Sequence, residues 1–244
     1  MVDTLLKIFW EMFLSMEEIC YFQLLEVVGT VFSFCRLFEN KYGIVRLEYD
    51  RKTELYPANS YEQDGFKETL LQMYTHTGTH MDPPAHIFEG RTTLDEFPPE
   101  QFIGKALVVD CHELQEGEMI SMEHIRKAGE NVKKADFLLF YLGWDKRWGT
   151  DAYFGDYPCI DDEVLDFILS GNYKGIGFDV IGIDPIADMN LTRHKKLFRD
   201  CDIVNIENLK NLDLCGSELF WFSCFPLKIE NSDGSPVRAV AWFE

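Results

Sequence analysis

Compact runs of apolar residues, separated by polar stretches, are the clearest pattern along the chain. Three such runs cover residues 106–110, 137–142 and 176–183, and each is bounded by charged residues or by glycine. Apolar runs without polar alternation are typical of strands that are buried on both faces. A further strand is predicted over residues 237–243, because the hairpin signal Asp233-Gly234 precedes it.

Two helical patterns lie between these runs. Residues 121–128 begin with Ser121 and are followed by Gly129, and residues 161–170 begin with two aspartates and are followed by Gly171. Serine and aspartate favour the first position of a helix, and glycine favours the position after its end. Strands that alternate with helices indicate an α/β fold.

Weaker patterns precede the first apolar run. Residues 44–48 alternate as a strand does, residues 56–59 (Tyr-Pro-Ala-Asn) predict a turn, and residues 68–73 form a short apolar-periodic stretch. The sequence contains no repeat, low-complexity tract or flexible linker that would divide it. The simplest partition is one catalytic domain over residues 46–244 with an extension before it.

The extension is strongly apolar. Acidic side chains interrupt residues 1–35, and the basic start and cleavage site of a signal peptide are missing. The stretch 19–35 contains Gln23 and Glu26 and is shorter than the about 20 apolar residues of a transmembrane helix. We therefore predict that residues 1–45 form one or two helices, with apolar faces that pack on the body or on a partner subunit.

The composition narrows the classes of partner. The chain has 42 acidic and 23 basic residues and a formal net charge of −19, which would repel nucleic acid and anionic membrane surfaces. Its seven cysteines are odd in number and scattered, as in a protein with reduced thiols. We therefore expect a cytoplasmic protein with neither a nucleic-acid nor a membrane partner.

The candidate chemistry lies in His76-Thr-Gly-Thr-His80-Met-Asp82-Pro-Pro-Ala-His86, which holds three of the six histidines of the chain. A straight strand would separate His76 from His80 by about 13 Å. A straight helix would bring these two side chains to one face but would turn Asp82 elsewhere. Gly78 allows the backbone to bend, and the two prolines prevent a helix from continuing, which leaves a curled loop with converging side chains.

Imidazole and carboxylate are the ligands expected for zinc or manganese. The alternative for His76 and His80 alone is a pair of neighbours on a helix surface. Asp82 and His86, placed around glycine and proline, favour a metal site. The segment by itself does not indicate which reaction such a site would catalyse.

Further segments have distinctive patterns: Tyr141-Leu-Gly-Trp144, Gly177-Phe-Asp179 with Asp184, His194, Ile206-Glu-Asn-Leu209, and Asp233-Gly-Ser-Pro-Val-Arg-Ala239. Together with the histidine segment they resemble the signatures of the cyclase-like metal-dependent hydrolases, which include bacterial kynurenine formamidase and isatin hydrolase. The resemblance covers roughly residues 48–244. It implies an α/β domain with mixed β-sheets flanked by helices, a swivelling β/β/α fold, usually as a homodimer or a larger assembly.

The resemblance also implies a set of metal ligands. His76, His80 and Asp82 would bind one ion, and Asp82 would bridge to a second ion held by His194 and Glu207. Glu207 would contact both ions, as in the formamidase branch. The ions would be zinc, one or two per subunit, while the isatin hydrolase branch implies a single manganese. The alternative for His194 alone is a histidine on a helix surface, and Glu207 alone would be interpreted as an exposed acid.

Two further residues receive roles from the resemblance. His86 would be the proton shuttle, and Tyr56 would line the substrate pocket, although a turn residue on the surface is an alternative for Tyr56. Neither a Gly-x-Ser-x-Gly nucleophile motif nor a glycine-rich phosphate loop is present in the sequence.

These residues predict a metal-dependent hydrolase that cleaves an amide or formamide of a small molecule, similar to N-formylkynurenine. A lactam or lactone hydrolase and a metal-binding scaffold without turnover are the alternatives.

Overall fold

A computed structural model describes residues 31–33 and 53–243 of the chain. The predicted strand over residues 44–48 and most of the predicted helical extension over residues 1–45 lie outside the described residues. Within that extension, Val31–Ser33 form a strand, β1, rather than a helix, and pair antiparallel with the last strand of the fold. Valine and phenylalanine favour strands, and the edge of the main sheet supplies the pairing partner.

The main sheet has the strand order β1-β12-β11-β5-β7-β9-β10-β4 in the described part of the chain. Besides β1, its strands are β4 (His80–Asp82), β5 (Ile103–Asp110), β7 (Phe137–Tyr141), β9 (Gly175–Phe178), β10 (Val204–Glu207), β11 (Phe220–Pro226) and β12 (Ser235–Trp242). The four strands β5, β7, β9 and β10 run parallel, and their neighbours run antiparallel. Because β4 pairs both with β10 and with the start of β12, the sheet closes on itself.

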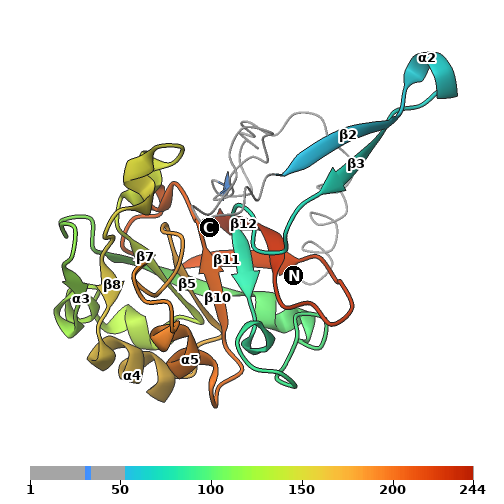
Figure 1. Cartoon of the computed structure of the whole chain (residues 1–244). Coiled ribbons are helices and arrows are strands. Elements are labelled where there is room, and N and C mark those ends of the chain that lie inside the picture. The colour runs from blue at the N-terminus through green and yellow to red at the C-terminus, as the bar shows by residue number, and fades with distance from the viewer. Residues whose placement is uncertain (1–30, 34–52, 244) are drawn as a thin grey trace.

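Three helices lie along the outer side of the parallel strands (Figure 1): α3 (Met122–Lys127), α4 (Asp162–Ser170) and α5 (Thr192–Phe198). One apolar core fills the space between these helices and the sheet, and a second is enclosed by the strands. On β5, Leu107 and Val109 belong to the outer core, whereas Ala106 and Val108 belong to the enclosed core. This arrangement confirms the predicted burial of that strand on both faces.

The predicted helix starts are also confirmed. The side chain of Ser121 accepts a hydrogen bond from the backbone N–H of Glu123, and that of Asp161 accepts one from Val164. Shorter helical turns connect the strands: η1 (Pro84–His86), η2 (Pro99–Phe102), η3 (Glu130–Lys134), η4 (Trp144–Arg147), η5 (Asp151–Phe154) and η6 (Leu212–Leu214). None of the helices in the described residues has both the length and the apolar character needed to cross a bilayer.

The third predicted strand is shorter than its apolar run. The run extends to residue 183, but β9 ends at Phe178. The next residue, Asp179, accepts hydrogen bonds from the backbone N–H groups of Leu142 and Trp144, both at 3.0 Å. These bonds fix the carboxylate at the end of the neighbouring strand, and the chain leaves the sheet while its side chains stay largely buried.

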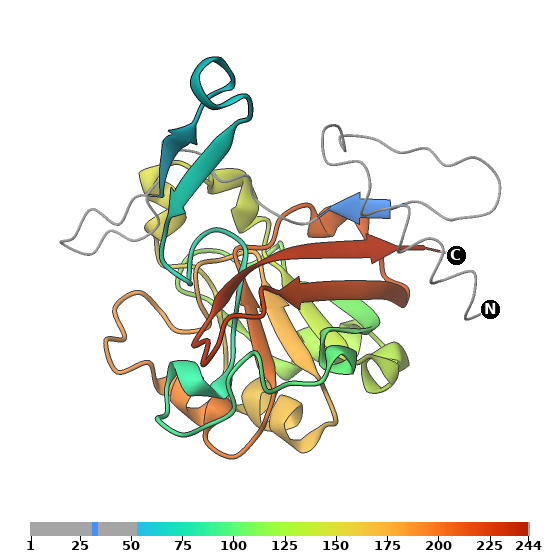
Figure 2. The same ribbon diagram turned by 90° about the vertical axis from the view of Figure 1, so that its right-hand side faces the viewer.

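A two-stranded arm projects from the body (Figures 1 and 2). It consists of β2 (Glu54–Asn59), α2 (Tyr61–Asp64) and β3 (Glu68–Gln72), and its strands pair antiparallel. The predicted turn over residues 56–59 is therefore wrong. Pro57 is tolerated because it lies in a two-stranded ribbon with a bulge, and the chain reverses later, where Gly65 has a φ of 78°.

Two remaining connections complete the fold. β6 (Met119–Ile120) and β8 (Cys159–Ile160) form a small parallel pair. Residues 227–234 connect β11 to β12, so Asp233-Gly234 closes a long loop instead of forming a two-residue hairpin turn.

Candidate metal centre

The site is built on the antiparallel strand pair β4–β10. Glu207 lies opposite His80, and Asn205 lies opposite Asp82. Alternate residues of a strand face the same side of a sheet, so these four polar side chains share one face. Met81, between the two β4 residues, instead enters the enclosed apolar core. The alternation along both strands therefore separates the core from a buried polar cluster.

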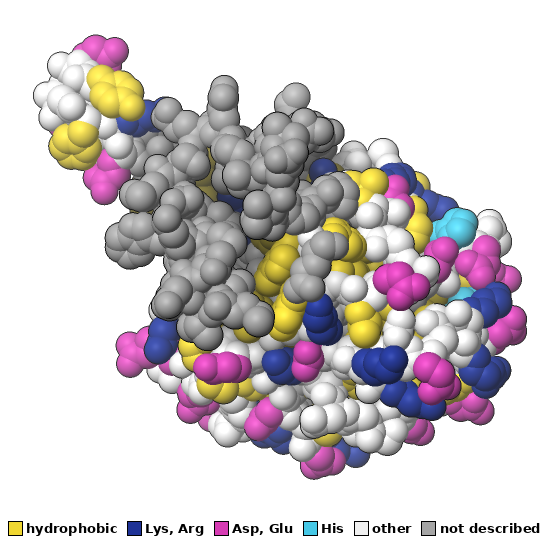
Figure 3. Space-filling model, turned by 180° about the vertical axis from the view of Figure 1, so that it is seen from behind, with side chains coloured by type: hydrophobic (Ala, Val, Ile, Leu, Met, Phe, Trp, Pro, Cys, Tyr) yellow, Lys and Arg dark blue, Asp and Glu magenta, His cyan; other side chains and the backbone are white. Residues whose placement is uncertain are grey.

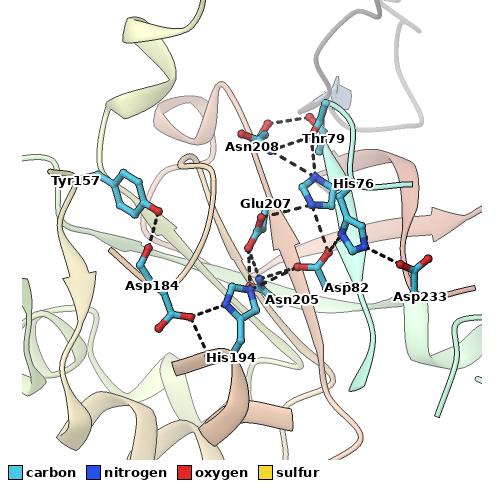
Figure 4. A network of polar contacts seen from close by, with 12 residues as sticks. His76, Thr79, Asp82, Tyr157, Asp184, His194, Asn205, Glu207, Asn208 and Asp233 are labelled. Carbon is cyan, nitrogen blue, oxygen red and sulfur yellow. Dashed lines mark hydrogen bonds and ion pairs between the residues drawn. The ribbon is translucent and has the colours of Figure 1, made fainter. Parts of the chain in front are cut away.

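His76 reaches this cluster from the loop before β4 (Figure 4). Gly78 has a φ of 67°, a backbone conformation that favours glycine and bends the chain. As a result, Nδ1 of His76 lies 2.7 Å and Nε2 of His80 lies 3.3 Å from Oδ1 of Asp82. The predicted convergence of these three side chains is observed, but only His76 lies on the bent loop, because His80 and Asp82 belong to strand β4.

His194 enters the cluster from the first turn of α5. The carboxylate of Asp184 accepts hydrogen bonds from the backbone N–H groups of Arg193 and His194, which are otherwise unpaired at the start of a helix. Nε2 of His194 then lies 3.2 Å from Oε1 of Glu207 and 3.7 Å from Oδ2 of Asp82. At 5 % exposure, His194 is not the surface histidine of the alternative interpretation, and Glu207, also 5 % exposed, is not an exposed acid.

The cluster contains two groups of side chains that could each hold a metal ion. One is formed by His76, His80 and Asp82, and the other by Asp82, His194 and Glu207; in each group the ligand atoms lie within 4.8 Å of one another. Asp82 belongs to both groups. The structure thus brings together all five residues of the predicted ligand set.

Each of the three histidines has a polar partner on its other ring nitrogen. The pairs are His80 Nδ1 with the carbonyl of Gly78 at 2.9 Å, His194 Nδ1 with Asp184 Oδ2 at 2.6 Å, and His76 Nε2 with Asp233 Oδ2 at 3.3 Å. Metal-binding histidines usually donate their second ring N–H to a carboxylate or a carbonyl, which fixes the ring and its tautomer. The residues present therefore fit a divalent metal both in the ligand atoms that face one another and in the hydrogen bonds that orient the histidine rings.

The His76 ring packs against the backbone of Gly234, in the space that a side chain at this position would fill. A Cβ atom at this position would lie 2.5 Å from Cε1 and 2.6 Å from Nε2 of His76, closer than side chains approach. The dipeptide Asp233-Gly234 thus holds His76 by a hydrogen bond on one side and a close backbone approach on the other.

The charges of the cluster compensate one another. Burial lowers the pKa of His76 and of His80, but neighbouring carboxylates together outweigh it. Asp82 with Asp233 raises the pKa of His76 to about 9, and Asp82 with Glu207 raises that of His80 to about 10. The same pairing keeps the pKa of Asp82 well below its usual range although burial opposes this. The buried carboxylates therefore bind positive charge strongly, either as protons on the imidazoles or as a metal cation that displaces them.

His86 lies beside the cluster at the end of η1. Its ring centroid is 4.0 Å from that of His76 and 6.0 Å from that of His194. Burial lowers the pKa of His86, and the charges of His76 and His194 act in the same direction, against Asp82. His86 is therefore suited to remain neutral near pH 7. It also forms a third group of metal-ligand type with His76 and Asp233.

Tyr56 is not brought into the cluster within the described structure. It lies on the arm strand β2, 44 % exposed, and its hydroxyl donates to the carboxylate of Glu54. Tyr56 thus stands apart from the six other predicted site residues.

Three residues that contact the cluster are absent from the site residues predicted from the sequence: Asp184, Asn205 and Asp233. Asp184 and Asp233 lie in segments that resemble the family signatures, so their position was a usable signal. Asn205 carried a weaker signal, its spacing of two residues from Glu207 on one strand.

Several known proteins are similar to this chain in sequence or in fold. The family model described as "Putative cyclase" matches residues 25–185. Kynurenine formamidase of Bordetella avium is 30% identical over 170 residues, covering 70% of this chain and 78% of that protein. Isatin hydrolase of Roseibium aggregatum is 27% identical over 213 residues, covering 78% and 81%.

A solved structure supports the fold. Isatin hydrolase A from Labrenzia aggregata, bound to benzyl benzoate, matches with a TM-score of 0.77 at 23% sequence identity, over 87% of this chain and 93% of that one. The predicted fold class, a mixed α/β fold of the cyclase type, is confirmed. The predicted enzyme class is that of the named relatives, which are hydrolases of C–N bonds other than peptide bonds. The chain belongs to the cyclase family.

Proposed function

We propose that this chain hydrolyses a C–N bond of a small molecule, and that a formamide similar to N-formylkynurenine is the leading substrate class. The observation that carries the proposal is the convergence of three imidazoles and two carboxylates around the shared residue Asp82. The kynurenine formamidase relative supports the formamide, and the isatin hydrolase relative supports a lactam as the second candidate.

The proposed ligands are His76, His80, Asp82, His194 and Glu207. Oδ1 of Asp82 faces His76 and His80, and Oδ2 faces His194. Glu207 faces His80 through Oε2 and His194 through Oε1. Each carboxylate therefore presents an oxygen to each of the two groups of histidines. We propose one or two zinc ions per subunit; manganese also suits these nitrogen and oxygen ligands.

The chemistry combines a cation with a neutral base. A divalent cation lowers the pKa of water from about 15.7 towards about 7 and polarises a carbonyl. His86, with its lowered pKa, accepts the proton of the attacking water on a ring nitrogen and returns it to the leaving nitrogen. Water adds to the carbonyl carbon, the C–N bond breaks, and an acid and an amine are released.

A two-step experiment tests the proposal. Elemental analysis of the purified protein determines the metal, and absorbance assays then compare the turnover of N-formylkynurenine and isatin. Faster turnover of N-formylkynurenine would support the formamidase, and faster turnover of isatin the lactam hydrolase. Bound metal without turnover of a wider formamide, lactam and lactone panel would favour a scaffold, and absence of metal would contradict the proposal.

We further propose a homodimer or a larger homo-oligomer in the cytoplasm. Large apolar side chains on the arm are more than a third exposed, as expected for a surface that another subunit covers: Leu55, Tyr56, Tyr61, Phe66, Leu70 and Leu71. Free cysteines in the described residues are consistent with a reducing compartment. Sedimentation velocity tests the oligomer, and fractionation of cells tests the location.

A further inference from the structure

We infer that Asn205 is a positioning residue whose side-chain amide holds the two shared carboxylates, Asp82 and Glu207, in the orientation that metal binding requires. Asn205 is completely buried in the middle of β10, where it faces Asp82 on β4 and shares a strand face with Glu207. This inference rests on the proposed function, because it concerns the affinity of the same site for its metal.

The amide reaches both carboxylates at once. Nδ2 of Asn205 lies 3.2 Å from Oδ2 of Asp82 and 2.8 Å from Oε1 of Glu207 (Figure 4). An amide NH₂ group has two hydrogens, so each carboxylate receives one. A neutral double donor between two buried negative charges holds them in place and reduces their repulsion without adding a competing positive charge.

These two bonds divide the carboxylate oxygens between two sides. Oδ2 of Asp82 and Oε1 of Glu207 face Asn205 and His194. The other oxygen of each carboxylate lies 3.3 Å and 3.4 Å from Nε2 of His80. By fixing one oxygen of each carboxylate, the amide also fixes the direction of the second oxygen. Each carboxylate then presents one oxygen towards His194 and the other towards His80.

The amide oxygen of Asn205 indicates the role of this side chain. Among the described residues, Oδ1 of Asn205 is buried without a hydrogen-bond partner. Exchanging the amide oxygen and nitrogen would set the oxygen against two carboxylate oxygens, so the orientation is determined. A buried carbonyl without a donor destabilises a folded protein, and an apolar side chain of similar size avoids that loss. The amide is therefore explained by its two donated bonds rather than by folding.

The test compares Asn205→Leu with the wild-type chain. Leucine has a similar volume and lacks the donors. We expect the affinity for Zn²⁺, measured by competition with a chelating dye, to fall about 10–100-fold, as is typical for the loss of an outer partner. The melting temperature of the metal-free protein should fall less than that of Val204→Ala, because losing the two donated bonds is partly offset by removing the buried Oδ1 that has no partner. Asn205→Ala, which also lacks donors but adds no bulk, should lose affinity similarly if leucine prevents folding.

Val204→Ala is the matched control. Val204 neighbours Asn205 on β10 but enters the enclosed apolar core. We expect this variant to lower the melting temperature and to leave Zn²⁺ affinity unchanged.

Three results would overturn the inference. Equal Zn²⁺ affinity of wild type, Asn205→Leu and Asn205→Ala would show that the amide does not position the carboxylates. A fall in affinity together with a loss of metal-free stability as large as that of Val204→Ala would show a structural role. A wild-type chain that binds no Zn²⁺ would instead overturn the proposed function, and this inference with it.

Discussion

The strand pairs β4–β10 and β2–β3 are both short and antiparallel, and both depart from the usual rule that apolar side chains are buried and polar ones exposed. They depart from it in different ways. β4–β10 buries His80, Asp82, Asn205 and Glu207. The arm pair β2–β3 exposes apolar side chains on both strands, and Figure 3 shows hydrophobic side chains beside acidic ones at the end of the arm. One pair places polar groups where apolar ones are expected, and the other does the reverse.

The comparison shows what each inversion requires. Apart from Oδ1 of Asn205, the buried polar side-chain groups of β4–β10 have charged or hydrogen-bonding partners, and such a compensated cluster is typical of a site that binds a cation. The strands of the arm pair only with each other within the described residues. A hairpin of two strands is marginally stable alone, so an exposed apolar arm is typical of a surface for another subunit.

The largest expected effect concerns turnover at the buried polar cluster, beside which His86 lies. His86→Ala should reduce kcat about 10²–10⁴-fold, because a general base contributes about this factor, while the metal is retained. Kinetics together with elemental analysis of the same sample check this outcome. Loss of the metal in the variant would show that His86 is a ligand, as its grouping with His76 and Asp233 allows.

The next effect compares a glycine-to-alanine substitution at the metal site with the same substitution on the arm. In Gly234→Ala the new methyl group displaces the His76 ring, so we expect the affinity for Zn²⁺ to fall about 10–100-fold. In Gly65→Ala, at the end of the arm, a Cβ meets no atom within 4 Å but the positive φ is strained. This control should lose about 1 kcal/mol of stability and keep its metal affinity. Equal metal affinities of the two variants would contradict the proposed role of Gly234.

A smaller effect concerns pH. The pKa values of His76 and His80 are raised from 6.5 to about 9 and about 10 in the folded chain. Their contribution to the stability of the metal-free protein is complete below pH 6.5 and is lost as the pH rises to about 10. The melting temperature of the metal-free protein should therefore fall over this interval.

Zinc should reverse part of this trend. Its binding requires deprotonated imidazoles, so the apparent affinity rises with pH over the same interval. Calorimetric scans with and without Zn²⁺ measure both trends. A metal-free melting temperature that rises from pH 6.5 to 10 would contradict the charge pairing of the cluster.

The smallest effect on stability is expected at the arm. Leu70 is 57 % exposed on β3, so Leu70→Ser should change the free energy of unfolding of the subunit by no more than about 0.5 kcal/mol and leave metal content unchanged. Sedimentation velocity should nevertheless show a shift towards the monomer. A wild-type chain that is already monomeric would show that the proposed oligomer is wrong.

The sequence by itself determined the features that depend on neighbouring residues. The apolar runs of β5 and β7, the first residues of α3 and α4, and the bend at Gly78 follow from side chains within a few positions of each other. The convergence of His76, His80 and Asp82 belongs to the same class, because Gly78 and the prolines restrict the backbone locally. The function class came from the family resemblance of these same segments.

Tertiary structure decided the features that join distant parts of the chain. Asn205 and Asp82 are separated by 123 residues and meet because β10 pairs with β4. His194 resembles a surface residue in its sequence context, and Asp184 and the β10 strand bury it. The end of β9 likewise depends on backbone groups of another strand, which Asp179 contacts. Burial and hydrogen bonding across a sheet depend on which strands become neighbours, and a local pattern of residues does not contain that information.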